Sequence, residues 1–196
     1  GNVVLMTSTQ MSNQNPATYV QSAPEKVYEY IEDDLLYACD ILPYATDDQY
    51  RESNDYRFSK GAALGLLTKV YATWAGYPVK DESKWEAAAK TARILVESGK
   101  HGLLKDYEQL WKNTCNGTWD PTESLIEISF YSPTVSGNSD PVGRIGKWNG
   151  VKTTAIAGVR GSCAANVKVV HTFVLDWRED VSDIRRDLSI ANYQYT

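Results

Sequence analysis

The sequence predicts a mainly α-helical fold of tetratricopeptide-like helical hairpins, with long loops and a short β element. Two neighbouring segments, within 59–76 and 83–99, place apolar and small side chains at three- and four-residue spacing, which is the period of an α-helix that faces a partner. Alanine and glycine are frequent in both segments, so the two backbones can approach closely. Cap signals stand at both ends of each segment. These observations together predict a close-packed pair of helices.

The pattern also predicts which residues of the two helices should be in contact. The first helix is expected to present Ala62, Ala63, Leu66, Leu67, Val70, Tyr71 and Trp74. The second is expected to present Trp85, Ala88, Ala89, Ala92, Leu95 and Val96. Ser59 is the expected cap of the first helix and Gly76 its end, while Ser83 with Glu86 has the S-x-x-E spacing of a capping box and Gly99 suits a left-handed C-terminus.

A third helix should precede this pair. Ser22 and Glu25 form another capping-box pattern, a stripe of Val27, Ile31, Leu35, Ala38 and Leu42 follows, and Pro43 ends it. Further along, Leu125–Tyr131 alternates apolar and polar residues, which predicts a short strand. We therefore expect residues 1–196 to be one fragment of a domain, with a helical scaffold at about 22–112 and a strand and long-loop region at about 123–196.

Composition excludes several kinds of function. The net charge is -5, and no basic run is present, so a nucleic-acid groove is not expected. No apolar run is long enough to cross a bilayer. The two histidines and three cysteines show no metal-ligand spacing, and no phosphate-binding glycine motif occurs, so neither a metal nor a cofactor is predicted. Cys39 should lie in the core, whereas Cys115 and Cys163 lie in loops and could pair in an oxidising compartment.

Aromatic content points towards sugar recognition. The chain has 6 Trp and 13 Tyr but only 3 Phe, and rings with a polar edge suit the faces and hydroxyl rims of sugars. Trp74 and Trp85 fall on helical stripes and are expected in the core. In the glycine- and serine-rich segment from about Ser132 to Ser162, Trp148 lies beside Asn149 and near Arg144. The expected ligand-binding residues are Trp148, Arg144, Asn149, Tyr131 at the entry of this segment, and Trp119 in an earlier loop.

No pair of carboxylates has the pattern of a glycosidase. A retaining enzyme needs carboxyl groups about 5 Å apart and an inverting one up to about 9.5 Å. Glu123 and Glu127 would lie about 13 Å apart along a strand, at roughly 3.3 Å per residue. Asp176 and Asp180 could approach on a helix, but the arginines around them favour ion pairs. The chain is therefore not expected to be an enzyme.

Several blocks in succession resemble the SusD/RagB family of glycan-binding lipoproteins. They are VYEYIEDDLLYACDILP, RFSKGAALGLLTKVY, the W-x-x-A-x-x-x-A pattern that begins at Trp85, Ser98-Gly99, Leu103-Leu104, Asp106-Tyr107 and the run from Glu123 to Ile128. The segment around Asp180, Arg185 and Tyr193 resembles a later block of the family. Members are longer than 196 residues, and Gly1–Leu5 resembles a block well inside a full-length member, so an internal fragment is expected.

The resemblance implies a function without catalysis. The family binds an oligosaccharide or polysaccharide at the cell surface and passes it to a SusC-like TonB-dependent transporter during nutrient uptake. Location on the outer membrane, through a lipid anchor that this chain lacks, is implied in the same way. The alternative is a tetratricopeptide-like scaffold for protein interaction that binds no sugar, because helical hairpins of this kind stack on neighbours.

Overall fold

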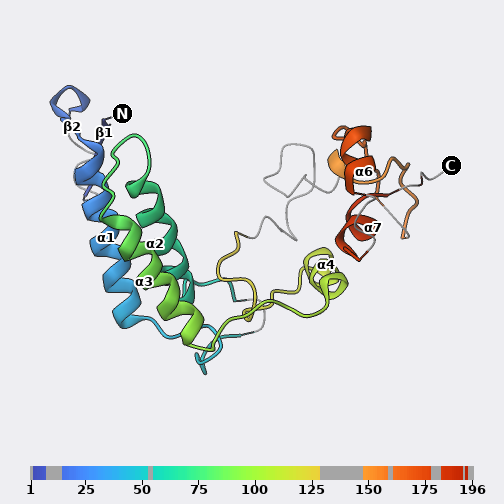
Figure 1. The fold of residues 1–196 in the computed structure, drawn as a ribbon, viewed down its shortest axis with the longest axis horizontal. Coiled ribbons are helices and arrows are strands. Elements are labelled where there is room, and N and C mark those ends of the chain that lie inside the picture. The colour runs from blue at the N-terminus through green and yellow to red at the C-terminus, as the bar shows by residue number, and fades with distance from the viewer. Residues whose placement is uncertain are drawn as a thin grey trace. The chain divides into compact units, whose positions relative to one another are not determined.

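The computed structural model is mainly helical, as predicted (Figure 1). It describes residues 2–7, 15–52, 55–128, 148–158, 161–177, 182–191 and 193. The chain divides into two compact units. Unit 1 comprises residues 1–105 and 112–127, and unit 2 comprises residues 106–111 and 128–196.

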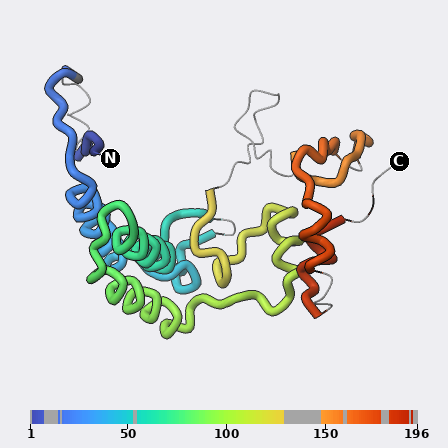
Figure 2. The backbone as a smooth tube through the Cα atoms, turned by 45° about the horizontal axis from the view of Figure 1, so that its top comes forward, coloured from blue at the N-terminus to red at the C-terminus, as the bar shows by residue number. Residues whose placement is uncertain are grey.

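Unit 1 is built around three helices that lie side by side in both backbone views (Figures 1 and 2). They are α1 (Pro24–Ile41), α2 (Lys60–Ala75) and α3 (Lys84–Glu97). Helix α2 packs against both α1 and α3. The core consists of Leu35, Ala63, Leu67, Tyr71, Trp74 and Ala88. Small residues at the crossing of α2 therefore allow it to be covered on two sides.

The predicted α2 surface is largely confirmed. Ala62, Ala63 and Leu67 are almost fully buried, and Trp74 is 5% exposed with the Tyr28 ring stacked on it at a centroid distance of 5.1 Å. Leu66 is an exception, because its side chain is exposed. Cys39 packs against the core as expected, and burial raises the pKa of its thiol.

The buried face of α3 differs from the face that the sequence predicts. Trp85 is 53% exposed, so its predicted place in the core is wrong, and Ala89 and Val96 are exposed as well. Ala88 is buried as predicted, and Thr91, which the pattern did not select, is buried as well. Helix α3 contains three consecutive alanines at 87–89, and adjacent positions of a helix point about 100° apart, so a run of identical residues leaves the facing side undetermined.

Cap predictions succeed at four helix ends and fail at two. The Ser59 hydroxyl accepts a hydrogen bond from the Ala62 amide at 3.3 Å, α2 ends at Gly76, α1 ends before Pro43, and Gly99 has φ 64°. Neither predicted capping box forms. The Ser83 hydroxyl donates to Asp81 and caps nothing in α3. Ser22 lies in strand β2 (Gln21–Ser22), which pairs antiparallel with β1 (Val3–Val4).

The β element therefore lies elsewhere than predicted. Residues 125–128 are not in a strand, and 129–131 lie outside the described residues. Leu125 instead packs on α2, because its Cδ1 occupies the space that a side chain at Gly65 would need. The glycine in the Leu64-Gly65 pair thus allows a later segment of the chain to contact the helix surface.

Unit 2 contains two short helices within the predicted loop region. They are α6 (His171–Trp177) and α7 (Arg185–Ser189). Helix α4 (Tyr107–Asn116) belongs to unit 2 as far as Trp111 and to unit 1 from Lys112 on, and the side chain of Trp111 is 47% exposed. Trp148 and Asn149 are also helical, and most of the remaining described part of unit 2 is extended or irregular, with an isolated antiparallel bridge between Thr153 and Cys163.

Candidate functional site

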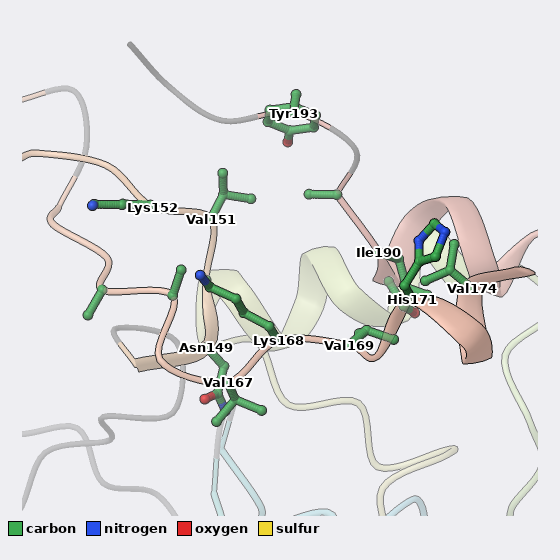
Figure 3. Close-up of a pocket in the computed structure, with 15 residues that line it drawn as sticks. Asn149, Val151, Lys152, Val167, Lys168, Val169, His171, Val174, Ile190 and Tyr193 are labelled. Carbon is green, nitrogen blue, oxygen red and sulfur yellow. The ribbon is translucent and has the colours of Figure 1, made fainter.

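The candidate site is an open pocket of about 540 Å³ that lies entirely within unit 2 (Figure 3). Its volume falls in the range of about 300–1,000 Å³ that is usual for small-molecule sites. Four segments contribute lining residues: 149–152, 164–169, the first part of α6, and 189–193 at and after the end of α7. Residues more than forty positions apart in the sequence therefore share one pocket.

One wall of the pocket is a pair of antiparallel segments. Thr153 and Cys163 exchange two backbone hydrogen bonds of 3.1 Å, and the Asn166 amide donates to the Trp148 carbonyl at 2.7 Å. Ala165 has φ 51°, the left-handed region that an alanine seldom adopts. The backbone thus turns sharply at a residue that lines the pocket.

A polar cluster joins α6 to α7. The Trp177 indole donates to Asp183 Oδ2 at 3.1 Å, and the Arg185 guanidinium donates to both Asp183 oxygens at 2.8 and 2.6 Å. These hydrogen bonds, those from Arg185 first, hold the pKa of Asp183 well below its usual range. Asp183 therefore stays ionised at neutral pH. Its hydrogen bonds join Trp177 of α6 to Arg185 of α7, and Ser189 at the end of α7 lines the pocket.

The lining combines apolar side chains with a few polar groups. Valines, alanines and an isoleucine supply the apolar surface, while Asn149, Ser189 and Tyr193 supply an amide and two hydroxyls. In Figure 3 the hydroxyl end of Tyr193 is directed towards the interior of the group of side chains. Such a mixture suits a ligand that has both apolar faces and hydroxyl groups.

The charge of the lining is entirely positive. Lys152 and Lys168 line the pocket, and no Asp or Glu is among the described lining residues. His171, from the first turn of α6, is also present. Across the described part of the chain, no group of three His, Cys, Asp or Glu side chains could hold a metal ion.

The structure brings together some of the predicted site residues. Asn149 lines the pocket, and Trp148 is next to it with its side chain 41% exposed and its carbonyl bonded to the opposite segment. Arg144 and Tyr131 lie outside the described residues. Trp119 belongs to unit 1 and is only 8% exposed.

Other side chains of the protein cover the ring of Trp119. The Tyr56 ring lies 5.7 Å from it between centroids, and the Arg51 guanidinium lies 5.4 Å from its ring. Arg51 is itself held by the carbonyls of Asp55 and Arg57 at 2.9 and 2.8 Å. The indole therefore packs under the linker between α1 and α2, and little of its face is open to a ligand.

Sequence reasoning did not select Lys152, Lys168, His171 or Tyr193. A weak signal was present, because Val151-Lys152 and Val167-Lys168-Val169 alternate apolar and cationic residues, as a half-buried extended segment does. That the two lysines line the same pocket depends on the pairing of segments that the local pattern does not reveal.

The structure also bears on the predictions for the cysteines and for Asp176 and Asp180. None of the three cysteines forms a disulfide in the structure, and Cys115 and Cys163 belong to different units. Asp176 is exposed on α6, while Asp180 lies outside the described residues. Among the described helices, none is both long enough and apolar enough to cross a membrane.

Comparison with known proteins finds similarity to a SusD-like protein. No protein-family model matches the sequence. A SusD-like protein from Bacteroides ovatus is 26% identical over 160 residues, which cover 76% of this chain and 28% of that protein. A crystal structure of a SusD superfamily protein from Parabacteroides distasonis aligns with 31% identity over 56% of this chain and 22% of that one, with a TM-score of 0.46.

The chain thus spans little more than a quarter of the length of the relative from Bacteroides ovatus. The matched part nevertheless covers three quarters of the chain itself, well beyond a single helical hairpin. The chain is therefore SusD-like, as the succession of blocks in its sequence predicts.

Proposed function

We propose that this chain contributes to the binding of an oligosaccharide at the cell surface, and that the pocket of unit 2 is where the sugar binds. The observation that carries the proposal is the pocket itself, which has a volume of about 540 Å³ and an amide and two hydroxyls among apolar side chains. Trp148, whose side chain is 41% exposed, directly precedes the lining residue Asn149 in the sequence. A sugar presents hydroxyl groups around its rim and C–H groups on its faces, so both kinds of surface would have partners.

The relationship to SusD-like proteins supports the wider role. In the proposed arrangement, the complete protein is a lipoprotein on the outer membrane and delivers its glycan to a SusC-like TonB-dependent transporter. Arg144 and Tyr131 stay in the proposal as further contacts from the segment before Trp148. Trp119 is a weaker candidate, because the structure buries its ring.

No catalysis is part of the proposal. In unit 2, Asp183 and Asp187 are each bonded to an arginine, and Arg186 donates to Asp187 at 2.8 and 3.0 Å. These hydrogen bonds lower the pKa of both carboxyl groups, whereas a general acid in a glycosidase requires a raised pKa. The charged groups of unit 2 thus serve better to hold α6 and α7 than to transfer a proton.

Isothermal titration of the chain and its Trp148→Ala variant with a panel of oligosaccharides tests the proposal. Loss of a stacking ring should weaken binding by about 1–2 kcal/mol, or roughly 5- to 30-fold in Kd. The melting temperature should change little, because the side chain is partly exposed. Trp85→Ala is the matched control, since Trp85 is an exposed tryptophan on α3 in the other unit. Equal effects of the two substitutions would contradict the proposal.

The protein-scaffold alternative has one observation in its favour. Helix α3 exposes Ile94 and Val96 as well as Trp85, and α1 exposes Tyr37 and Ile41. Exposed apolar side chains on stacked helices suit contact with another helical surface. If no oligosaccharide binds and Trp85→Ala alone disturbs the association of the complete protein, this alternative becomes the better account.

A further inference from the structure

The charge of the pocket in unit 2 points to a class of ligand. Lys152 and Lys168 are both lining residues, and neither forms an ion pair with a carboxylate in the described part of the chain. No Asp or Glu is among the lining residues that the structure describes. The pocket therefore carries positive charge that no carboxylate in the described part of the chain neutralises, although the net charge of the chain is -5.

The arginines of the same unit behave differently. Arg185 is bonded to Asp183 and Arg186 to Asp187, so the described arginines of unit 2 are paired. The two described lysines of unit 2 form no such ion pair, and both line the pocket. A general excess of surface lysine would not produce this division, in which the paired cations lie on or beside helix α7 and the unpaired cations line the pocket.

Backbone hydrogen bonds hold the two segments that carry the lysines. Lys152 precedes Thr153, which pairs with Cys163, and Lys168 follows Asn166, whose amide is bonded to the Trp148 carbonyl. In Figure 3 the Lys168 side chain extends towards the segment that carries Val151 and Lys152. The two lysines thus come from opposite segments of one wall, and no described group accepts a hydrogen bond from either ammonium group.

We propose that the pocket selects an oligosaccharide that carries an anionic group, a carboxylate or a sulfate ester, and that Lys152 and Lys168 recognise this group. The inference rests on the proposed function, because it names the class of sugar that the same pocket binds. An anionic oxygen accepts charge-assisted hydrogen bonds from an ammonium group, which are stronger than those between neutral groups. Asn149, Ser189 and Tyr193 then serve the neutral hydroxyls of the same ligand.

The experiment is isothermal titration of the 196-residue chain with three tetrasaccharides: a neutral glucan, an oligogalacturonate and a sulfated galactan. The protein variants are the wild type, Lys152→Gln with Lys168→Gln, and a control with Lys69→Gln and Lys90→Gln. The control lysines are exposed on α2 and α3 and remove the same formal charge from the other unit. Each protein is measured at low and high salt.

We expect the wild type to bind at least one of the two anionic sugars more tightly than the neutral one. The pocket variant should bind that sugar about tenfold more weakly, and the control variant should match the wild type. Binding of the anionic sugar should weaken as salt is raised, because screening acts on exposed charges. The carboxylate and sulfate arms show which anion is preferred.

Different results would overturn the choice of an anionic sugar and the binding of sugar itself. Equal affinity for neutral and anionic sugars would overturn this inference and leave the proposed function intact. Anionic binding that the pocket variant and the control variant weaken alike would overturn the assignment to Lys152 and Lys168. Binding of none of the three sugars would overturn the inference together with the proposed function. Circular dichroism of each variant verifies that the substitutions leave the fold unchanged.

Discussion

Lys84 lies with its ammonium nitrogen 3.8 Å from the centroid of the Trp74 ring. The same nitrogen is 3.1 Å from each carboxylate oxygen of Glu32 on α1, and Tyr71 on α2 donates its hydroxyl to that carboxylate at 2.7 Å. One cation at the start of α3 thus contacts a ring of α2 and a carboxylate of α1. This is the point at which all three helices of unit 1 are joined by polar interactions.

The first prediction concerns this contact. Lys84→Met keeps most of the apolar stem but removes the charge, so Glu32 loses its cation and Trp74 its cation–π partner. The pair is mostly buried, with side chains 18% and 22% exposed, and we expect a loss of about 1–2 kcal/mol in the free energy of unfolding. Chemical denaturation measures it, with Lys90→Met on the exposed side of α3 as the control. Equal midpoints for the two variants would show that the contact adds no stability.

The second prediction concerns the face of α3. Ala88 is 7% exposed and belongs to the core, whereas Ala89 is exposed. Ala88→Leu should therefore force extra methylene groups into the helix contact and destabilise the protein by about 1–3 kcal/mol. Ala89→Leu should change stability by less than about 0.5 kcal/mol. Denaturation midpoints of the two variants give the comparison. A cost at Ala89 as large as that at Ala88 would restore the face that the sequence pattern predicts, which includes both residues.

Unit 1 shows how far the sequence could predict the fold. The helix ends at Ser59, Gly76 and Gly99 follow from local chemistry, because a cap depends on residues within one turn. Ser22 and Ser83 have the same local pattern but find other partners, in a strand from Val3–Val4 and in Asp81. Those partners compete for the hydroxyl or the backbone, and the four-residue S-x-x-E motif does not include them.

Local sequence patterns predict even less of the candidate site, because its residues come from segments that are separate in the sequence. The sequence selects Trp148 and Asn149 because a ring beside an amide in a glycine-rich segment is a local signal. The contribution of Lys168 depends on the hydrogen bond from the Asn166 amide to the Trp148 carbonyl, which joins segments that are separate in the sequence. Trp119 was selected on the same local grounds as Trp148, but Arg51 and Tyr56 from a distant linker cover it.

The third prediction tests the contact between α2 and the segment around His101. A Cβ atom added at Gly61 would overlap the His101 ring, which is held by a bond of 2.9 Å between its Nδ1 and the Pro121 carbonyl. Gly61→Ala should therefore destabilise the chain by about 1–3 kcal/mol, although alanine is the better helix former. A Cβ added at Gly102 meets no atom within 4 Å, so Gly102→Ala is the control.

A second substitution separates the overlap from other causes. His101→Ala removes the ring, so the cost of Gly61→Ala should become much smaller in that background. A double-mutant cycle of thermal unfolding measures the difference. Additive effects of the two substitutions would contradict direct contact between these residues.

The fourth prediction concerns alkaline pH. Burial, followed by the hydrogen bond to Glu32, raises the pKa of Tyr71 above its usual value of about 10. The folded protein therefore keeps the phenol proton at a pH where the unfolded chain has lost it. This contribution to stability is complete below about pH 10 and is lost as the pH rises towards the folded pKa.

Denaturation midpoints of the wild type and Tyr71→Phe between about pH 8 and 11 measure this effect. Lysine deprotonation affects both proteins alike, so the informative quantity is the difference between them. The wild type should lose stability more steeply than Tyr71→Phe above about pH 10. Parallel curves would show that Tyr71 titrates equally in the folded and unfolded states.

The central claim is that the pocket of unit 2 holds the sugar, and the fifth prediction tests it by hydrogen–deuterium exchange. The chain is measured with and without a saturating amount of the oligosaccharide that binds it most tightly in titration. Ligand contact should slow exchange in peptides that cover 149–152 and 164–169, which line the pocket. Peptides from α1, α2 and α3 should exchange at unchanged rates. Protection that is confined to the region of Trp119 or to the exposed face of α3, with none at 149–152 and 164–169, would contradict the account.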